Sequence, residues 1–395
     1  MLISFIIIFF ETIMDYKIES LKRHKQYKGK IEITSKFPEI NTKDDLSIAY
    51  TPGVAAVSSL LASDPKEAYN YSIKSNTIAV VSDGSAVLGL GNIGPYGALP
   101  VMEGKALLFK QYGGVDAYPI VLNTQDVEEI IAIVTAIAPT FGGINLEDIS
   151  APRCFEVERR LIEKLGIPVF HDDQHGTAIV VLAALINSLK LVGKSKAKVK
   201  VVVCGAGAAG IAVTKLLHTY GMSDITLVDS QGIVSRSRED VNDEKRLMLE
   251  ITNPDNRSGD LCEALNQADV FIGVSAPDIL KPECIKTMAD KPIIFAMANP
   301  VPEIMPDVAK KAGSYIVGTG RSDFPNQINN VLAFPGLFRG LLDNRIQIVT
   351  DKIKISVAEV LAGYLPDDQL NTECILPSVL DKKVSMAIAQ RLKTV

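Results

Sequence analysis

A glycine-rich turn between a β-rich run and an apolar helical segment constrains the fold of this chain more than any other feature. The run Lys198–Cys204 leads directly into a G-x-G-x-x-G turn, which consists of Gly205, Ala206, Gly207, Ala208, Ala209 and Gly210. An apolar segment, Ile211–Tyr220, follows, and a second β-rich run ends at Asp229. This order of strand, glycine turn, helix and acidic residue is typical of a Rossmann-type dinucleotide-binding unit.

The three glycines of the turn have separate physical roles. We expect Gly205 to permit the tight turn, Gly207 to let a pyrophosphate approach the backbone, and Gly210 to let the helix pack close to the strand. The N-terminus of the helix then offers free N–H groups and the positive end of its dipole to the phosphates. A glycine-rich turn without a ligand is the alternative, and the presence of strand, helix and acid together argues against it.

Asp229 sets the expected cofactor preference. Its carboxylate is predicted to accept hydrogen bonds from both ribose hydroxyls and to repel a 2′-phosphate, which favours NAD over NADP. Arg236 and Arg238 follow closely and are suited to bind a 2′-phosphate, so NADP stays an open alternative.

Short β-rich runs alternate with helical patterns from about residue 78 onward. The predicted strands are Ile78–Val81, Ala117–Leu122, Ile144–Leu146, Ile167–Phe170, Lys198–Cys204, Ile225–Asp229, Val270–Val274 and Ile293–Ala296. The predicted helices include Asp126–Ala138, Pro152–Leu165 and Thr177–Leu191. Such alternation predicts βαβ units and mainly parallel sheets. We therefore expect an α/β fold with an N-terminal α/β domain and a Rossmann-type, doubly wound dinucleotide-binding domain.

The length of 395 residues suggests two domains, at roughly 150 residues per domain. No Pro- or Gly-rich linker marks a division, and we place it near residue 168, before the long helix that precedes the glycine-rich strand. The expected domains are residues 14–168 and 169–395, and the segment from about Ser356 onward is expected to be helical.

Residues 1–13 form an apolar leader. Its run Leu2–Phe10 is too short for a membrane-spanning helix, which needs about 20 residues. No basic segment precedes the run and no small-residue cleavage site follows it, unlike in a signal peptide. A translation start at Met14, a short membrane anchor and an added apolar strand are the alternatives, and we favour the start at Met14.

The charge and the cysteines exclude several classes of protein. The formal net charge is −5, so the chain has no general electrostatic attraction to nucleic acid or to an anionic membrane, and neither is an expected partner. The five cysteines lie far apart without a C-x-x-C spacing. They argue against a disulfide framework or a zinc site and fit a reducing cytoplasm.

Two acidic pairs, Glu147-Asp148 and Asp172-Asp173, each follow a short apolar strand. If these strands are parallel neighbours, the pairs emerge at the same edge of the sheet, where α/β proteins bind ligands. Converging carboxylates repel each other unless protons or a divalent cation balance them, and oxygen ligands suit Mg²⁺ or Mn²⁺. From spacing alone, helix capping and turn formation are an equally good explanation.

Several stretches together resemble malic enzymes of the short, bacterial type, over residues from about 40 to 340. They are, besides the glycine turn, Tyr50–Ala55, Ser82–Pro95, Met102–Lys110, Ile144–Ile149, Phe170–Ala178 and Ala298–Pro300. The resemblance implies oxidative decarboxylation of L-malate to pyruvate and CO₂, with reduction of NAD(P)⁺ and a requirement for Mg²⁺ or Mn²⁺. It also implies that the N-terminal domain is the substrate domain and that the protein is a homodimer.

The resemblance assigns roles to individual residues. It implies that Glu147, Asp148 and Asp173 are the metal ligands. It implies that Lys105 takes the proton from the C2 hydroxyl and that Tyr50 protonates the enol carbon after CO₂ has left.

Two asparagines complete the implied site. Asn299 is implied to contact the substrate and the cofactor, and Asn330 is implied to contact the substrate. Larger malic enzymes carry an arginine after Asp-Gly that binds a substrate carboxylate, whereas Gly84-Ser85-Ala86 has none here. The group that binds the distal carboxylate is therefore left unassigned.

Two other functions compete with a malic enzyme. A malolactic enzyme, which converts malate to lactate with the cofactor still bound, has the same site residues. A non-catalytic dinucleotide sensor on the same fold predicts loss of the base, the acid or the metal carboxylates, and all of them are present.

Overall fold

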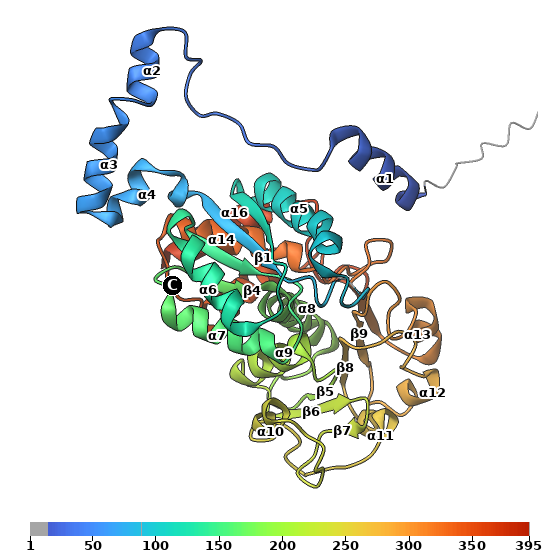
Figure 1. The fold of residues 1–395 in the computed structure, drawn as a ribbon. Helices are drawn as coiled ribbons and strands as arrows, with labels where there is room; N and C mark the ends of the chain where they lie inside the picture. Colours follow the sequence, from blue (N-terminus) through green and yellow to red (C-terminus); the bar gives the residue numbers. More distant parts are fainter. Residues whose placement is uncertain (1–14, 88, 395) are drawn as a thin grey trace, which may run out of the picture.

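The computed structural model describes residues 15–87 and 89–394 and contains two β-sheets covered by helices (Figure 1). The α/β class predicted from the alternation of strands and helices is confirmed. The predicted leader, residues 1–13, and the favoured start at Met14 lie outside the described residues.

The first sheet belongs to the N-terminal half of the chain. Its strand order is β2-β1-β3-β4, with β1 Thr77–Ser82, β2 Asp116–Val121, β3 Gly143–Leu146 and β4 Val169–His171. All of its pairings are parallel. The strands β1 and β3 are buried along their whole length, as strands covered on both faces must be.

The second sheet has the order β10-β9-β8-β5-β6-β7. Its strands are β5 Lys200–Cys204, β6 Asp224–Asp229, β7 Gly232–Ile233, β8 Val270–Gly273, β9 Ile293–Ala296 and β10 Ile316–Thr319. All pairings are parallel except the short one between β6 and β7. Because the chain continues to β6 on one side of β5 and to β8 on the other, the order reverses at β5, and such a switch point is where dinucleotides bind.

The predicted elements agree closely with the structure. All eight predicted strands are present, with their ends shifted by at most two residues. Strands β7 and β10 were not predicted, because β7 has only two residues and β10 is a four-residue run that contains a glycine. The predicted domain division at residue 168 precedes β4, which pairs with β3 in the first sheet.

Helices cover both sheets, as Figure 1 shows. The first sheet carries α5 Gly94–Gly113, α6 Val127–Ile137 and α7 Arg153–Lys164. The segment around the second sheet contains α8 Thr177–Val192, α9 Ala208–Thr219, α10 Asp243–Met248, α11 Leu261–Leu265, α12 Pro282–Ile285 and α13 Pro306–Ala312. The C-terminal helices are α14 Phe334–Asp343, α15 Asp351–Gly363 and α16 Lys383–Arg391, so the segment from Ser356 onward is largely helical, as predicted.

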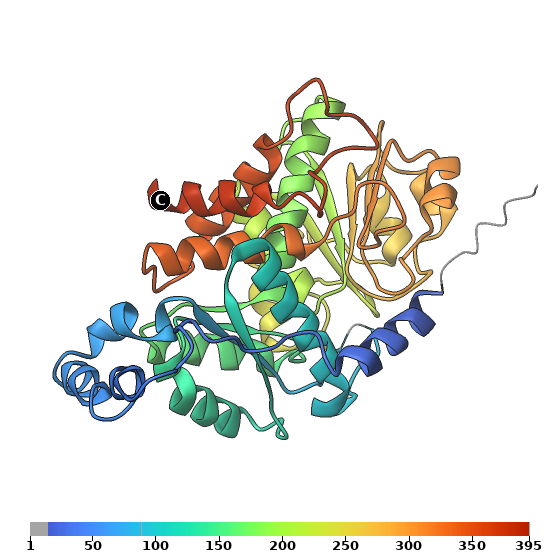
Figure 2. The ribbon, with the colours of Figure 1, turned by 90° about the horizontal axis from the view of Figure 1, so that it is seen from above.

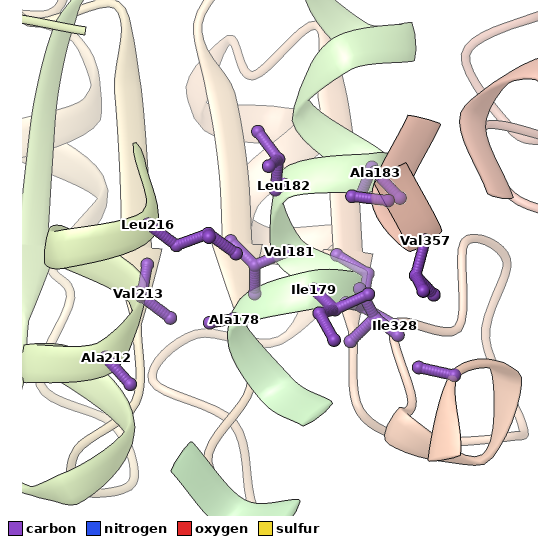
Figure 3. Close-up of a cluster of buried hydrophobic side chains, with 14 of the residues drawn as sticks. Ala178, Ile179, Val181, Leu182, Ala183, Ala212, Val213, Leu216, Ile328 and Val357 are labelled. Atoms are coloured by element: carbon purple, nitrogen blue, oxygen red, sulfur yellow. The ribbon is translucent and has the colours of Figure 1, made fainter. Parts of the chain in front are cut away.

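Helix α8 lies at the centre of the largest apolar core, and most of its residues are buried. In Figure 3, Val181 faces Leu216 of α9, whereas Ala183 faces Val357 of α15. The same core contains Ile78 of the first sheet and residues of the second sheet, so one continuous apolar interior joins the two halves. This interior fixes the distance between the edges of the two sheets.

Helix α14 attaches the C-terminal segment to the first sheet. The ring of Phe334 lies 4.6 Å from that of Phe109 on α5, and the ring of Phe338 lies 5.3 Å from Phe109. All three side chains are fully buried. Since Phe109 is one helical turn from Lys105, this packing also holds the helix that carries the predicted base.

Residues 15–72 form an N-terminal arm that runs along the outside of the molecule (Figures 1 and 2). Its helices α1 Tyr16–Tyr27, α2 Lys43–Ala49, α3 Val54–Ser63 and α4 Ala68–Tyr71 bury none of their residues. Large apolar side chains such as Ile33 and Ile48 are 81% and 70% exposed. The arm therefore presents an exposed apolar surface.

Two described segments are long and apolar enough to cross a membrane when only length and composition are considered. They are Lys43–Ser63, which contains α2 and α3, and Asp172–Val192, which contains α8. The second segment is mostly buried in the core, so its apolar character is explained by packing.

The spacing of the cysteines argued against a disulfide framework, and the structure joins one pair of them. Cys262 on α11 and Cys284 on α12 are joined by a disulfide, with their Cα atoms 4.8 Å apart. The two short helices pack against each other, which brings together two cysteines that are 22 residues apart in the sequence. The wide spacing of cysteines in the sequence did not reveal this contact.

Candidate functional site

The two acidic pairs meet at the carboxyl edge of the first sheet. Strands β3 and β4 are parallel neighbours with Leu146 opposite His171, so Glu147-Asp148 and Asp172-Asp173 emerge side by side. The backbone N–H of Asp148 donates to Oδ2 of Asp173 at 2.7 Å. Asp148 has a φ of 54°, in the left-handed region that Asp tolerates better than most residues. The convergence expected from strand pairing is confirmed.

Lys105 projects from α5 into this acidic cluster. Its Nζ lies 2.8 Å from Oε1 of Glu147 and donates a short hydrogen bond to Oδ2 of Asp172. The ring of Phe334 lies on another side, with its centroid 4.1 Å from Nζ. Lys105 is only 7% exposed, so the ammonium is held by two carboxylates and an aromatic face rather than by water.

Burial and mutual repulsion shift the pKa values of the cluster. Burial raises the pKa of Asp172 to about 7 and that of Asp173 to about 6, although Lys105 acts in the opposite direction. The pKa of Glu147 is raised for the same reason. Burial pulls the pKa of Lys105 down, but the facing carboxylates more than offset this effect and hold it above its ordinary value. The cluster therefore carries more potential negative charge than its one ammonium balances.

The predicted ligands Glu147, Asp148 and Asp173 are three carboxylates at the same edge of the first sheet. Within residues 15–87 and 89–394, no three His, Cys, Asp or Glu side chains converge with the geometry of a metal centre, and the ammonium of Lys105 lies among the acids. The donor set nevertheless fits, because several buried carboxylates face one ammonium and Oδ1 of Asp172 is buried without a hydrogen-bond partner among the described residues. Carboxylate oxygens are the ligands that Mg²⁺ and Mn²⁺ prefer.

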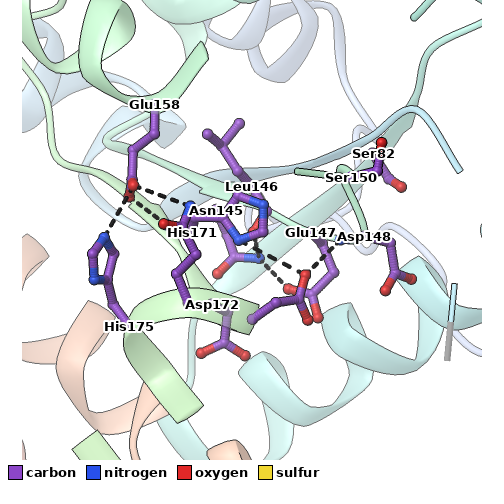
Figure 4. A network of polar contacts seen from close by, with 12 residues as sticks. Ser82, Asn145, Leu146, Glu147, Asp148, Ser150, Glu158, His171, Asp172 and His175 are labelled. Atoms are coloured by element: carbon purple, nitrogen blue, oxygen red, sulfur yellow. Dashed lines mark hydrogen bonds and ion pairs between the residues drawn. The ribbon is translucent and has the colours of Figure 1, made fainter. Parts of the chain in front are cut away.

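A second carboxylate, which the sequence analysis missed, organises the turn that carries Asp172 and Asp173. Glu158 on α7 is buried, and its carboxylate lies next to His171 and His175, which flank the acidic pair (Figure 4). It accepts hydrogen bonds from the backbone N–H of His171 at 2.9 Å, from Gln174 Nε2 at 3.3 Å and from His175 Nε2 at 3.0 Å. These bonds hold both sides of the acidic pair.

Asn145 has a similar supporting role on the other strand. It is fully buried on β3, and its Nδ2 donates to Oε2 of Glu147 at 2.9 Å (Figure 4). The bond orients the Glu147 carboxylate while its other oxygen contacts Lys105. The alternation of side chains along a strand would have placed Asn145 and Glu147 on the same face, which is the signal that was available in the sequence.

The glycine turn has the predicted context. It connects β5 with α9, which begins at Ala208, with Gly207 at the N-cap position. Gly205 has a φ of 116°, in the region that favours glycine. A Cβ at Gly210 would overlap the carbonyl oxygen of Gly205, so only glycine permits the close approach of helix and turn. The conformations predicted for Gly205 and Gly210 are those observed.

Asp229 ends β6, as predicted, and is engaged by two cations. Arg238 Nη1 and Nη2 lie 2.7 and 3.1 Å from its carboxylate oxygens, and Lys245 Nζ lies 2.5 Å from Oδ2. Arg236 instead donates to the carbonyl oxygens of Asn253 and Leu249. Of the two arginines considered from the sequence, Arg238 is therefore the one that contacts Asp229, and Lys245 is a cation that the sequence analysis missed.

The two predicted asparagines have different neighbours. Asn330 is next to the acidic turn, since a Cβ at Gly176 would be 3.2 Å from its Cβ. The side chain of Asn299 is next to Gly320, and its carbonyl oxygen touches Gly89 of the first domain. Asn299 therefore stands where the dinucleotide-binding domain meets a loop of the first domain.

Tyr50, the predicted acid, is not among the buried residues around Lys105. It follows α2 in the N-terminal arm and is 66% exposed. The cluster around Lys105, in contrast, is buried. Within one described chain, the proposed acid therefore lies outside the buried cluster.

The turn Asp83-Gly84-Ser85-Ala86 contains no arginine, but an arginine of α7 contacts it. Arg153, at the start of α7, donates from Nη2 and Nε to Oδ2 of Asp83 at 3.1 and 3.3 Å. Asp83 is fully buried, and its other oxygen accepts from the backbone N–H of Ser85 at 3.0 Å. Asp83 is thus paired with an arginine that lies 70 residues away along the chain.

Comparisons with known proteins agree with the geometry over most of the chain. The model of the malic enzyme N-terminal domain matches residues 28–162, and the model of the malic enzyme NAD-binding domain matches residues 174–395. The chain is 58% identical over 362 residues to the NAD-dependent malic enzyme of Geobacillus stearothermophilus, covering 92% of this chain and 75% of that protein. It is 53% identical over 378 residues to the bifunctional malic/malolactic enzyme of Bacillus subtilis (strain 168), covering 95% and 92% of the two chains.

A solved structure shows the same architecture. The crystal structure of the NAD-dependent malic enzyme from Thermotoga maritima superposes with a TM-score of 0.92 at 50% identity. The match covers 95% of this chain and 99% of that one. With both family models and these relatives spanning nearly all of it, the chain belongs to the malic enzyme family.

Proposed function

We propose that this chain catalyses the oxidative decarboxylation of L-malate to pyruvate and CO₂, with reduction of NAD(P)⁺ and a requirement for Mg²⁺ or Mn²⁺, in the cytoplasm. The observation that carries the proposal is the buried amine of Lys105, which contacts Glu147 and Asp172 at the carboxyl edge of the sheet. A buried lysine among carboxylates that are suited to a divalent cation is the arrangement that this reaction needs.

The proposed reaction is tested by a direct assay of the purified protein. NADH or NADPH formation is followed by absorbance after malate is added, with NAD and NADP in parallel and with or without Mn²⁺. We expect malate-dependent reduction that requires Mn²⁺ and is faster with NAD. Absence of reduction with both cofactors at saturating Mn²⁺ would refute the proposed function.

The residues of the cluster have distinct proposed roles. Lys105 accepts the proton of the C2 hydroxyl as hydride leaves C2. Because the resting Lys105 is an ammonium, it must first pass a proton to Asp172, with which it is in direct contact. Tyr50 returns a proton to C3 after CO₂ has left. When bound by Glu147, Asp148 and Asp173, a divalent cation supplies Lewis-acid charge to the oxygens of the substrate.

The proposed contacts with substrate and cofactor come from loops beside the acidic turn, beside the glycine turn and at the contact between the domains. We propose that Asn330, beside the acidic turn, and Asn299, at the contact between the domains, bind malate, with Asn299 also touching the cofactor. The residues of the turn, Gly205 to Gly210, bind the pyrophosphate, and Asp229 binds the ribose hydroxyls. NAD is the preferred cofactor in this proposal.

The Asp229→Ser variant is expected to shift cofactor preference towards NADP. Removal of the carboxylate abolishes its repulsion of a 2′-phosphate and releases Arg238 and Lys245 to bind that phosphate. Because each hydrogen bond to a charged group contributes about 1.5–3 kcal/mol, we expect the ratio of kcat/KM for NADP to that for NAD to rise about a hundredfold.

The matched control for this change is Asp240→Ser. Asp240 is an exposed partner of the same Arg238, so its loss removes a charge without opening the ribose site. We expect an unchanged ratio in the control. An unchanged ratio in Asp229→Ser as well would contradict the role of Asp229.

Malolactic conversion stays a second candidate because one relative carries that activity in its name, the bifunctional malic/malolactic enzyme of Bacillus subtilis. The two reactions differ in the fate of the reduced cofactor. Accumulation of free NADH together with pyruvate identifies the malic reaction, whereas lactate formation without free NADH identifies the malolactic one.

We further propose that the protein is a homodimer in which the N-terminal arm covers a second copy of the chain. The arm buries none of its helical residues in one chain, and contact with a second copy would remove its apolar side chains from water. Tyr50 lies on this arm, apart from the Lys105 cluster of its own chain. Exchange of arms would bring the tyrosine of one protomer to the site of its partner.

Mixing two inactive variants tests the exchange of arms. We expect Tyr50→Phe and Lys105→Ala, each inactive alone, to recover about a quarter of wild-type activity after subunit exchange, since half of the dimers are mixed and each has one intact site. A mixture of Lys105→Ala with Asp173→Asn is the control and should recover nothing. Failure of the first mixture to recover activity, with mixed dimers detected by mass, would show that Tyr50 serves its own chain.

A further inference from the structure

A buried carboxylate in the dinucleotide-binding domain lies outside the site described above. Glu303 is in the loop between β9 and α13, and it has no exposed surface. Within the described part of the chain, the groups that hold it are N–H and O–H donors rather than a cation. Because burial of a charge is costly unless hydrogen bonds compensate it, the contacts of such a carboxylate define what it does.

The carboxylate of Glu303 ties together the ends of two neighbouring strands. Its Oε1 accepts from the backbone N–H of Ser275 at 2.9 Å and from the Ser275 hydroxyl at 3.2 Å. Its Oε2 accepts from the backbone N–H of Ala298 at 3.0 Å. Ser275 follows β8 and Ala298 follows β9, so each oxygen holds one strand end.

One strand end lies against the glycine turn, and the other leads to the contact between the domains. Next to Ser275, the carbonyl oxygen of Val274 would be 2.5 Å from a Cβ at Gly205, so the end of β8 abuts the glycine turn. Ala298 directly precedes Asn299, whose carbonyl oxygen touches Gly89 of the first domain. The two loops that Glu303 joins therefore run from the dinucleotide turn to the contact between the domains, along the carboxyl edge where ligands bind.

We propose that Glu303 is a positioning residue, which fixes Ser275 against the glycine turn and Asn299 at the domain contact. These loops would then be held in place to bind the nicotinamide half of the dinucleotide and the substrate beside it. The inference rests on the proposed function, because it takes Asn299 as a substrate and cofactor contact. Glu303 itself touches neither molecule.

The Glu303→Gln variant tests the proposal. Gln has the size of Glu but places an NH₂ group against one of the two backbone N–H donors, so one strand end is released. We expect the Kd for NADH, from fluorescence titration, to rise about tenfold, and kcat/KM for malate to fall about ten- to a hundredfold, as loss of a hydrogen bond to a charged group implies. Mn²⁺ binding, measured by electron paramagnetic resonance, should not change. The control is Glu283→Gln, an exposed glutamate on α12 of the same domain.

A merely structural role lowers the midpoint of thermal unfolding or the yield of folded protein but leaves the Kd for NADH and the KM for malate at wild-type values. That result would overturn the proposal. In an Asn299→Ala background, the effect of Glu303→Gln on kcat/KM for malate should shrink to the roughly two- to fivefold that remains through Ser275, because residues that act through one another are not additive. Fully independent effects of the two substitutions would also overturn it.

A milder substitution is available should Glu303→Gln fail to fold. Ser275→Ala removes one of the three donors and is expected to change the same two quantities about two- to fivefold. Unchanged values in Ser275→Ala would then count against the proposal. The NADH titration does not depend on malate turnover, so an inactive wild-type protein would refute the proposed function while the titration still decided the role of Glu303.

Discussion

Lys105→Ala is expected to lower kcat for malate oxidation about 10²- to 10⁴-fold, the usual contribution of a positioned general base. NADH binding should stay unchanged, because the glycine turn and Asp229 are on the other sheet. The substitution also removes the only ammonium that contacts Glu147 and Asp172 among the described residues, which is expected to lower the free energy of unfolding by about 3–5 kcal/mol. Steady-state kinetics, fluorescence titration with NADH and thermal unfolding measure these effects.

Two further variants separate loss of the base from loss of the fold. Lys105→Arg retains a cation among the carboxylates but cannot give up its proton, so we expect a folded protein that is similarly inactive. Lys110→Ala, on the same helix but with an exposed side chain, should retain wild-type kcat. Normal turnover in Lys105→Ala, or substantial turnover in Lys105→Arg, would refute the assignment of Lys105 as the base.

Asp173→Asn is expected to raise the Mn²⁺ concentration for half-maximal activity at least a hundredfold. Loss of a supporting group near a metal typically costs 10- to 100-fold in affinity, and loss of a direct ligand costs more. In the wild type, Oδ2 of Asp173 accepts a hydrogen bond from the backbone N–H of Asp148 at 2.7 Å. The side-chain oxygen of Asn can accept the same bond, so the fold should persist. Direct Mn²⁺ titration by electron paramagnetic resonance measures the affinity without reference to turnover.

Asp126→Asn is the matched control for the metal experiment. Asp126 is exposed at the N-cap of α6, where Asn caps equally well, so the variant loses one negative charge and no proposed ligand. Its Mn²⁺ titration should equal that of the wild type. An equal titration in Asp173→Asn would exclude Asp173 as a ligand.

The fold was predictable because its signals are local. The strand before the glycine turn, the helix after it and Asp229 at the end of the next strand depend only on the order of short segments, and all lie as predicted. Strands β7 and β10 escaped prediction because they are short, and the Cys262–Cys284 pair escaped because it depends on the packing of α11 against α12.

The candidate site was predictable in part. The acidic pairs could be located because they follow two parallel strands, and parallel strands end at the same edge. Glu158 could not be found in this way, because it belongs to α7 and reaches the acidic turn only through the packing of that helix against β4. Lys245 was missed for a related reason, since only the path of the chain after β7 brings it back to Asp229.

The amino-acid sequence by itself determined the α/β class, the dinucleotide turn and the strand ends that carry the acidic residues, because hydrophobic periodicity and glycine spacing act over short stretches. Only the tertiary structure decided that Lys105 meets Asp172, 67 residues further along, and that Tyr50 lies apart from both on an exposed arm. Such contacts depend on how α5 packs against the first sheet and on which surfaces remain uncovered, and no local pattern in the sequence encodes either.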